Sequence, residues 1–239
     1  MKNERVKGRP SRCRLRMKLY SAPLSLFSRK VEIALREKEI DFEREMAPFT
    51  QAQGYEPRHP VVLAINPKRQ VPVLIDGDLA LFDSTLIFEY LEDLRPSPPL
   101  YPADIRMRAR CRLLELTGDE ILAPLAFRLG YRTVPRASDA QVQADREAAG
   151  HQAEADIAKL YDDLSGRLGV GDFFCGGFSY ADIALFMAVL FVLRLNGPRL
   201  SAWPVLARWY ASVGARPSVA VAAEEIAAAD RELTPLLAR

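Results

Sequence analysis

The sequence is short of the residues on which most metal and redox sites depend. Its 239 residues include two histidines, His59 and His151, and three cysteines, Cys13, Cys111 and Cys175. The cysteines form no CxxC pair and no metal-ligand spacing, and two histidines are too few for most metal or triad chemistry. We therefore expect no metal, and a reducing, cytoplasmic compartment in which Cys111 and Cys175 pack in the core.

The chain also lacks a hydrophobic run long enough to cross a membrane. The longest run, 183–193, has eleven residues, whereas a membrane-spanning helix needs about 20. This run is predicted to be a buried core helix, and no membrane partner is expected.

Most of the chain lacks an excess of positive charge. The formal net charge is +2, but residues 1–16 carry seven Lys or Arg against one Glu, so this leader holds +6 and the remainder −4. A mildly acidic body without a basic stripe predicts no nucleic-acid partner. The leader has no apolar stretch, so it is not a secretory signal. Because Met17 opens directly into a strand pattern, we expect residues 1–16 to be either disordered or a misassigned start.

The hydrophobic patterning changes near residue 100. The expected strands are 18–21, 41–46, 71–75 and 80–82, with the hairpin signal Asp76-Gly77-Asp78 between the last two. Helical spacing covers 28–38 and 84–94, and 48–67 is irregular. Four prolines within 95–102 cannot continue a helix. The later patterns are all helical, over 103–131, 138–167, 180–195, 203–215 and 218–232.

This order predicts an α/β domain followed by an all-α domain. We place the first at residues 17–95, the linker at 96–102 and the helical domain at 103–239. Ser179-Tyr-Ala-Asp182, which precedes the long apolar run, is predicted to be a structural capping box whose loss costs roughly 1 kcal/mol.

Ser25 ends the loop that connects the first predicted strand to the first predicted helix. Backbone N–H groups and the positive end of the helix dipole converge at such a position and favour an anion, such as a thiolate. A hydroxyl there can donate one hydrogen bond. Taken alone, however, an ordinary N-cap serine explains the residue better. The other nearby hydroxyls are Ser21, Ser28 and Tyr20.

Two residue pairs further along add to this pattern. Val71–Pro72 precedes a strand, and a cis bond would turn the Val71 backbone outward, where an extended peptide could pair with it. A trans proline at a strand edge is the commoner case, but the flanking Asn66-Pro67 and Asp83-Ser84 favour cis. Ser84 is predicted to cap a helix whose exposed N–H groups suit a carboxylate.

These segments, in this order and spacing, resemble the glutathione-binding half of a cytosolic glutathione S-transferase of the serine type, of a bacterial-like kind. The resemblance covers residues 17 to about 230. It implies a thioredoxin-like N-terminal domain followed by an all-helical C-terminal domain, and a homodimer. It also implies glutathione as co-substrate, whose thiolate attacks a small hydrophobic electrophile, as in detoxification.

The resemblance implies roles for individual residues. Ser25 matches the catalytic serine that stabilises the thiolate. Val71–Pro72 matches the element that holds the cysteinyl part of glutathione, and Gln70 can reach the glycyl end. Ser84 matches the serine that binds the γ-glutamyl carboxylate, with Asp83 facing the amine. Many family members have Glu or Gln before that serine, and Asp83 is one methylene shorter than Glu.

The second substrate and the reaction type stay open. Phe127, Arg128, Tyr131 and Arg132 fall near the end of the first long helix after the linker and are candidates to line a second-substrate pocket. A solvated helix end explains the arginines about equally well. The alternatives to conjugation are a non-catalytic glutathione-binding or regulatory protein, and a glutathione-dependent isomerase or dehalogenase.

Overall fold

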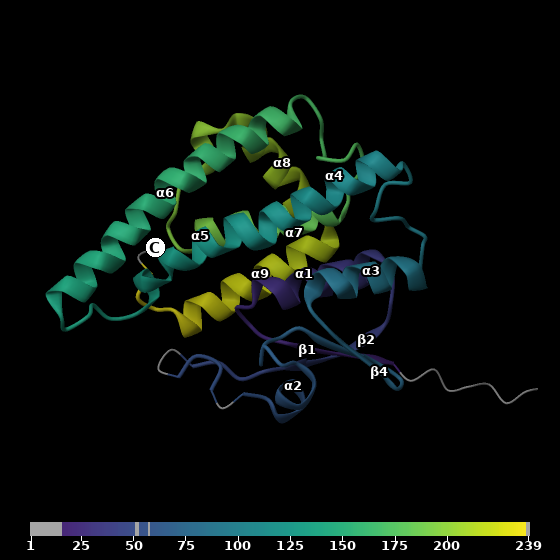
Figure 1. Cartoon of the computed structure of the whole chain (residues 1–239), viewed down its shortest axis with the longest axis horizontal. Helices are drawn as coiled ribbons and strands as arrows, with labels where there is room; N and C mark the ends of the chain where they lie inside the picture. Colours follow the sequence, from purple (N-terminus) through teal and green to yellow (C-terminus); the bar gives the residue numbers. More distant parts are fainter. Residues whose placement is uncertain (1–15, 51–52, 57, 238–239) are drawn as a thin grey trace, which may run out of the picture.

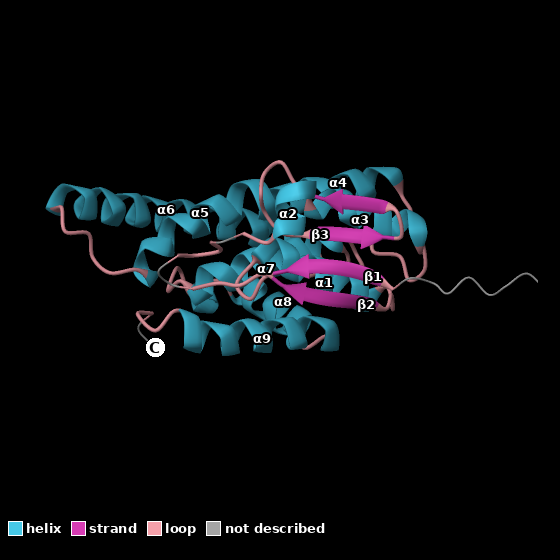
Figure 2. Ribbon diagram, turned by 90° about the horizontal axis from the view of Figure 1, so that it is seen from below, coloured by secondary structure: helices cyan, strands magenta, loops and turns pink. Residues whose placement is uncertain are grey.

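The computed structural model describes residues 16–50, 53–56 and 58–237. A four-stranded sheet has the strand order β2-β1-β3-β4, with β1 parallel to β2 and antiparallel to β3, and β3 antiparallel to β4 (Figure 2). The strands are β1 (Met17–Ser21), β2 (Phe42–Met46), β3 (Val73–Asp76) and β4 (Leu79–Phe82). This mixed sheet is the thioredoxin-like layer that the family resemblance implies.

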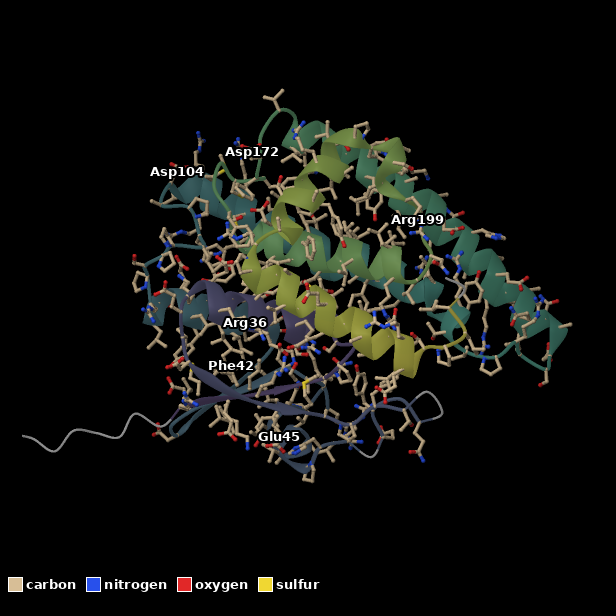
Figure 3. All side chains as sticks on the ribbon, turned by 180° about the vertical axis from the view of Figure 1, so that it is seen from behind. Arg36, Phe42, Glu45, Asp104, Asp172 and Arg199 are labelled. Atoms are coloured by element: carbon tan, nitrogen blue, oxygen red, sulfur yellow. The ribbon has the colours of Figure 1, made fainter. Side chains whose placement is uncertain are left out.

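Helices cover both faces of the sheet. α1 (Leu26–Glu37) and α3 (Ser84–Leu94) lie between the sheet and the helical domain, while α2 (Pro60–Ile65) lies on the opposite face (Figure 1). The inner face of α1 is apolar at helical spacing, and its Val31, Ala34 and Leu35 are fully buried. At the rim, the guanidinium of Arg36 lies 5.8 Å from the ring centre of Phe42 on β2 (Figure 3).

The helical domain is built around α7 (Tyr180–Arg194). Twelve of its residues are buried, as the apolar run predicts, and α7 packs against α1, α4 and α8. The other helices are α4 (Ile105–Leu116), α5 (Ala123–Arg128), α6 (Ala140–Leu168), α8 (Pro204–Gly214) and α9 (Pro217–Leu233). Among the described residues, no helix is both long and apolar enough to span a membrane. Cys111 and Cys175 are free and buried, as predicted.

The helix predicted over 103–131 is not continuous, which corrects the sequence-based expectation. A π-helical segment, Thr117–Leu122, separates α4 from α5, and a 3-10 turn follows at Leu129–Thr133. Gly118 marks the cause, because a Cβ there would lie 3.0 Å from the carbonyl carbon of Ala184 on α7. The backbones of two helices meet at this point, and the widened turn accommodates the contact.

The capping box at the start of α7 reaches further than its sequence pattern indicates. Asp182 accepts hydrogen bonds from the Ser179 N–H at 3.0 Å and the Ser179 hydroxyl at 2.9 Å. Its other oxygen accepts from Trp209 Nε1 at 2.9 Å and from the Phe174 N–H at 3.2 Å. Burial raises the pKa of Asp182, and these donors oppose the rise. One carboxylate therefore joins α7, α8 and the preceding loop.

A buried lysine joins the sheet domain to the helical domain. Lys30 on α1 has no exposed surface, and its ammonium contacts the carboxylate of Asp119 and lies 3.6 Å from Glu115 Oε1. Thr85, in the first turn of α3, donates to Glu115 Oε1 at 2.8 Å, and the Tyr101 hydroxyl donates to Glu115 Oε2 at 3.0 Å. This Lys30 cluster thus links α1, α3, α4 and the π-helical segment.

Replacement of Asp182 tests whether its carboxylate stabilises contacts beyond the first turn of α7. Asp182→Ala should lower the free energy of unfolding by about 2–4 kcal/mol, because it leaves a buried indole N–H and backbone N–H groups unpaired. The matched control is Asp104→Ala, since exposed Asp104 caps α4 through the Met107 N–H alone and should cost about 1 kcal/mol. Denaturant unfolding measures both, and equal losses would show that Asp182 acts only as a local cap.

Removal of the Lys30 ammonium should leave the buried carboxyl groups of Glu115 and Asp119 without a counter-charge. Lys30→Met is expected to lower the free energy of unfolding by about 3–5 kcal/mol. This loss of stability should grow between about pH 5.5 and about pH 8. Burial already raises the pKa of Glu115, and without Lys30 this carboxyl group must ionise at the higher pH with no counter-charge. Lys159→Met is the control, as Lys159 is 75% exposed, and it should change stability by less than about 0.5 kcal/mol. A loss independent of pH would contradict this account.

Candidate active site

Two adjoining cavities lie where the sheet domain meets α5 and the π-helical segment. The larger, the Ser25 cavity, has a volume of about 270 Å³, and the smaller, the Ser84 cavity, about 140 Å³. They share Phe27, Gln70 and Val71 in their walls. Each residue assigned to catalysis or glutathione binding by resemblance lines one of them: Ser25, Gln70 and Val71 the first, and Gln70, Val71, Pro72, Asp83 and Ser84 the second.

Ser25 is the N-cap of α1. Its Oγ accepts the N–H of Ser28 at 3.2 Å, and its hydroxyl proton is donated to no described residue. The side chain is half-buried and faces the Ser25 cavity. It therefore has a hydrogen bond to give at the positive end of a helix, where a developing negative charge is favoured.

The other hydroxyl-bearing residues near Ser25 are buried and do not line the two cavities. Ser28 is fully buried; its Oγ accepts from the Ala22 N–H at 3.2 Å, and its hydroxyl pairs with the Ser21 Oγ at 3.0 Å. Ser21 is also fully buried and reaches Glu32 Oε1 at 2.5 Å. Tyr20 is 5% exposed, and its ring packs against His59. None of these three hydroxyl-bearing residues lines the described cavities.

The loop before β3 presents free backbone to both cavities. The Val71–Pro72 bond is cis, as expected. Asn66 fixes this loop, because its Nδ2 donates to the Gln70 carbonyl at 2.5 Å. The N–H and C=O of Val71 make no backbone hydrogen bond with the described residues. An extended peptide could pair with them as an added strand.

The start of α3 forms the floor of the Ser84 cavity. The N-cap is Asp83, at φ +76°, and not Ser84 as predicted, because Asp83 Oδ1 accepts the Thr85 N–H at 3.1 Å and Ser84 is already the first helical residue. The side chain of Lys68 lies 3.4 Å from Asp83 Oδ2. Ser84 is buried, and neither its N–H nor its hydroxyl has a described hydrogen-bond partner. This N-terminus can therefore bind a carboxylate.

The irregular segment predicted over 48–67 contributes residues that sequence reasoning did not single out. Tyr55, Arg58 and His59 line the Ser25 cavity. His59 uses both ring nitrogens, with Nε2 2.7 Å from Glu45 Oε1 and Nδ1 accepting the Val61 N–H at 3.2 Å. Burial raises the pKa of Tyr55 to about 12, so its phenol stays protonated at neutral pH. The absence of helical or strand spacing over 48–67 was the one available signal.

The π-helical segment contributes two more residues without a sequence signal. Asp119 and Glu120 line the Ser84 cavity. Asp119 is 7% exposed and belongs to the Lys30 cluster, while Glu120 is exposed. A regular helix pattern would have placed these two side chains differently, because the π turn shifts the register of the residues that follow Gly118.

The four candidates for a second-substrate pocket separate in the structure. Phe127 lines the Ser25 cavity and packs edge-to-face against Phe27, with ring centroids 6.2 Å apart. Arg128, Tyr131 and Arg132 do not line either cavity.

Two of those three serve the packing of the helical domain, which corrects their expected place. Arg132 donates to the Leu195 and Asn196 carbonyls at 3.0 and 2.7 Å and pairs with Glu154 at 2.8 Å. The Tyr131 ring packs on Gly150 of α6, where a Cβ would come within 2.6 Å of it. Both side chains contact α6, and Arg132 also reaches the end of α7, because the 3-10 turn redirects the chain after Arg128.

Two family models match the chain. The glutathione S-transferase N-terminal domain matches residues 19–99, and the glutathione S-transferase C-terminal domain matches residues 140–212. Together they span more than half of the chain, in the order that the family requires.

Curated relatives carry two kinds of name. A stringent starvation protein A homolog of Coxiella burnetii (strain RSA 493 / Nine Mile phase I) is 39% identical over 41% of this chain and 44% of its own length. Glutathione S-transferase PARB of Nicotiana tabacum is 27% identical over 80% of this chain and 93% of its own length. The chain spans less than half the length of several relatives that it matches, the Coxiella protein among them.

Solved structures agree in fold over nearly the whole chain. A glutathione S-transferase from Rhodospirillum rubrum F11 is 29% identical with a TM-score of 0.70, over 85% of this chain and 90% of that one. A glutathione transferase homolog from Sulfitobacter with bound glutathione is 25% identical with a TM-score of 0.71, over 91% and 99%. With its thioredoxin-like domain followed by a helical domain, this chain belongs to the glutathione S-transferase family.

Proposed function

We propose that this protein is a serine-type glutathione S-transferase, which conjugates the glutathione thiolate to a small hydrophobic electrophile. The observation that carries the proposal is the uncommitted hydroxyl of Ser25. It stands at the N-terminus of α1 and lines the same cavity as the free backbone of Val71. A serine that served only as a helix cap would not need this combination.

Each part of glutathione has a matching group. Val71 would pair with the cysteinyl backbone as an added strand. The N-terminus of α3 with Ser84 would bind the γ-glutamyl carboxylate, and Gln70 faces the glycyl end. This binding would place the sulfur beside Ser25, whose hydroxyl donates to the thiolate while the helix dipole stabilises its charge. The thiol proton passes to solvent.

The electrophile would occupy the rest of the Ser25 cavity. Its wall is largely apolar, with Leu24, Phe27, Val62 and Phe127. Such a wall suits a hydrophobic substrate, whose reacting carbon faces the sulfur. A new carbon–sulfur bond then forms, and the displaced group leaves with the electron pair of the bond that breaks.

A second candidate is a glutathione-binding protein without turnover. It is favoured by the names of the Coxiella relative and of two further relatives of this kind, which refer to stringent starvation and not to transferase activity. Glutathione binding with no measurable conjugation across a panel of electrophiles would select this candidate.

Substitution of Ser25 separates the two candidates. Ser25→Ala should lower the rate of conjugation to a chloronitrobenzene by about 10- to 100-fold, the value of one hydrogen bond to a charged group. The dissociation constant for glutathione, measured by calorimetry, should change by less than about threefold, because the backbone contacts remain.

The matched control is Ser28→Ala. It removes a fully buried hydroxyl that holds the strand–helix junction, so it should lower the melting temperature and retain the rate per folded molecule. Full turnover of Ser25→Ala, with loss of turnover in Ser28→Ala, would assign the donor role to the other serine.

We also propose a homodimer, which the family resemblance implies. α3 and α4 lie side by side, joined by the pair of Glu89 with Arg112 at 2.7 Å. Beside this pair, Leu86, Leu113 and Leu116 are 50–59% exposed. Neighbouring exposed leucines on two helices suit burial against a second copy.

A charged substitution among the exposed leucines of α3 and α4 tests the proposed dimer. Leu113→Glu should convert a dimer to a monomer in sedimentation experiments, because the interface would then bury an unpaired carboxylate. Val170→Glu is the control, since Val170 is fully exposed in a loop of the helical domain and should leave the mass unchanged. A wild-type protein that sediments as a monomer at micromolar concentration would refute this proposal.

A further inference from the structure

A buried arginine lies behind the loop that carries Ser25. Arg29 follows Ser25 by one turn of α1 and is 2% exposed, and its Nη2 lies 3.4 Å from the Pro23 carbonyl oxygen. Its Nη1 donates to Glu32 Oε2 at 3.1 Å and also contacts Glu225 on α9. Because a guanidinium does not lose its proton in a protein, a fixed positive charge stands next to this loop.

The charged groups around Arg29 hold more positive than negative charge. Arg44 on β2 lies 2.7 Å from Glu32 and 2.5 Å from Glu225. Arg36 lies 3.4 Å from Glu32 on the side away from Ser25. These five residues form the Arg29 network: Arg29, Arg36, Arg44, Glu32 and Glu225. Three guanidinium groups face two carboxylates there, which leaves an excess of one positive charge.

The positive charge of Arg29 is incompletely matched by its neighbours. Its Nε is buried and donates to no described residue, an arrangement that folded proteins rarely leave without a reason. The Lys30 cluster, which joins α1 to α3 and α4, has the opposite balance, with one ammonium against two carboxyl groups. The positive excess beside α1 therefore comes from the Arg29 network and not from the Lys30 cluster.

The charge of Arg29 acts at the wall of the Ser25 cavity. Tyr55 lines this cavity, and burial raises its pKa to about 12, while the charges of Arg194 and Arg29 oppose the rise. A buried charge acts over a longer distance than an exposed one, because less water and salt screen it. The other ionisable side chains in the cavity wall are those of Arg58, His59 and Arg69.

We propose that the uncompensated positive charge of the Arg29 network stabilises the glutathione thiolate at Ser25, in addition to the N-terminus of α1 and the Ser25 hydroxyl. This inference rests on the proposed function, in which the sulfur lies beside Ser25. Arg29 lines neither cavity, so it acts through space from behind the loop. Because Glu225 belongs to α9, which packs along α1 (Figure 1), the helical domain helps to hold this charge in place.

The test is the pKa of the bound glutathione thiol, measured by thiolate absorbance against pH in two variants of opposite charge change. Arg29→Met leaves two guanidinium groups against two carboxylates, a balanced network, and should raise the thiol pKa by about 0.5 to 1. Glu225→Gln removes a negative charge and keeps an oxygen that can accept from Arg29 and Arg44. It should lower the thiol pKa by about 0.3 to 0.5.

The rate of conjugation to a chloronitrobenzene gives a second readout. At a pH below the pKa of the bound thiol, Arg29→Met should be about three- to tenfold slower than the wild-type protein, because the rate follows the fraction of thiolate. At about pH 9, where both proteins hold the thiolate, the two rates should agree within about twofold. A merely structural role for Arg29 would lower the rate equally at every pH.

Two control variants separate the charge from the fold. Glu224→Gln removes an equal charge from the exposed neighbour of Glu225 on α9 and should change the thiol pKa by less than about 0.2. Arg29→Lys keeps the charge on a side chain of different shape. It should lower the melting temperature and hold the thiol pKa within about 0.3 of the wild-type value.

Each other outcome counts against the inference. A raised thiol pKa in both Arg29→Met and Glu225→Gln would give these residues a structural role, and no change in either variant would show that their charge does not act on the sulfur. Both results overturn the inference, and a low thiol pKa in the wild-type protein would still leave the proposed function standing. If Arg29→Met does not fold, the sign of the change in Glu225→Gln decides alone. A wild-type thiol pKa equal to that of free glutathione would overturn both.

Discussion

The architecture of the site depends on one buried ammonium. Lys30 lies at the point where α1 of the sheet domain meets the π-helical segment of the helical domain, and it contacts no solvent. An ionised lysine at such a depth is tolerated only with counter-charges in contact. Asp119 and Glu115 supply them, and Thr85 ties the start of α3 to the same pair. The two domains and the Ser84 cavity are thereby held in one geometry.

Around this fixed point, the sheet domain contributes positive or donating groups to the two cavities. The N-termini of α1 and α3 each bring partial positive charge, at Ser25 and Ser84. Between them, Val71 offers backbone groups that no described residue satisfies. The helical domain adds Phe127 to the first cavity and Asp119 to the second. A ligand with one anionic sulfur and one zwitterionic end matches this division of charge.

Local chemistry explains what the sequence could predict. The cap at Ser25 and the cis bond at Val71–Pro72 each depend on a few neighbouring residues. The cap of α3 was predicted one residue too late, at Ser84, because Asp and Ser are both good N-cap residues. The π-helical segment could not be read in this way, because its cause is the approach of Gly118 to the backbone of α7, 66 residues away.

The difference between local and long-range causes also explains the outcome for the candidate second-substrate pocket. Phe127 faces the cavity, whereas the 3-10 turn carries Arg132 toward the Leu195 and Asn196 carbonyls. Helical periodicity predicts one helix over 103–131, which holds Phe127, Arg128 and Tyr131 and ends just before Arg132, and therefore gives no reason to separate the four candidates. Buried acids such as Glu115 look like surface residues in the sequence, since only the fold supplies the lysine that makes their burial possible.

The central claim is that Ser25 and the N-terminus of α1 stabilise a thiolate. The most direct measurement is the ultraviolet absorbance of the thiolate of bound glutathione as a function of pH, in wild-type protein saturated with ligand. A pKa for the bound thiol well below the value of about 8.5 for a free thiol is the predicted result. Binding with an unshifted thiol pKa would contradict the account and leave a protein that holds glutathione without activating it.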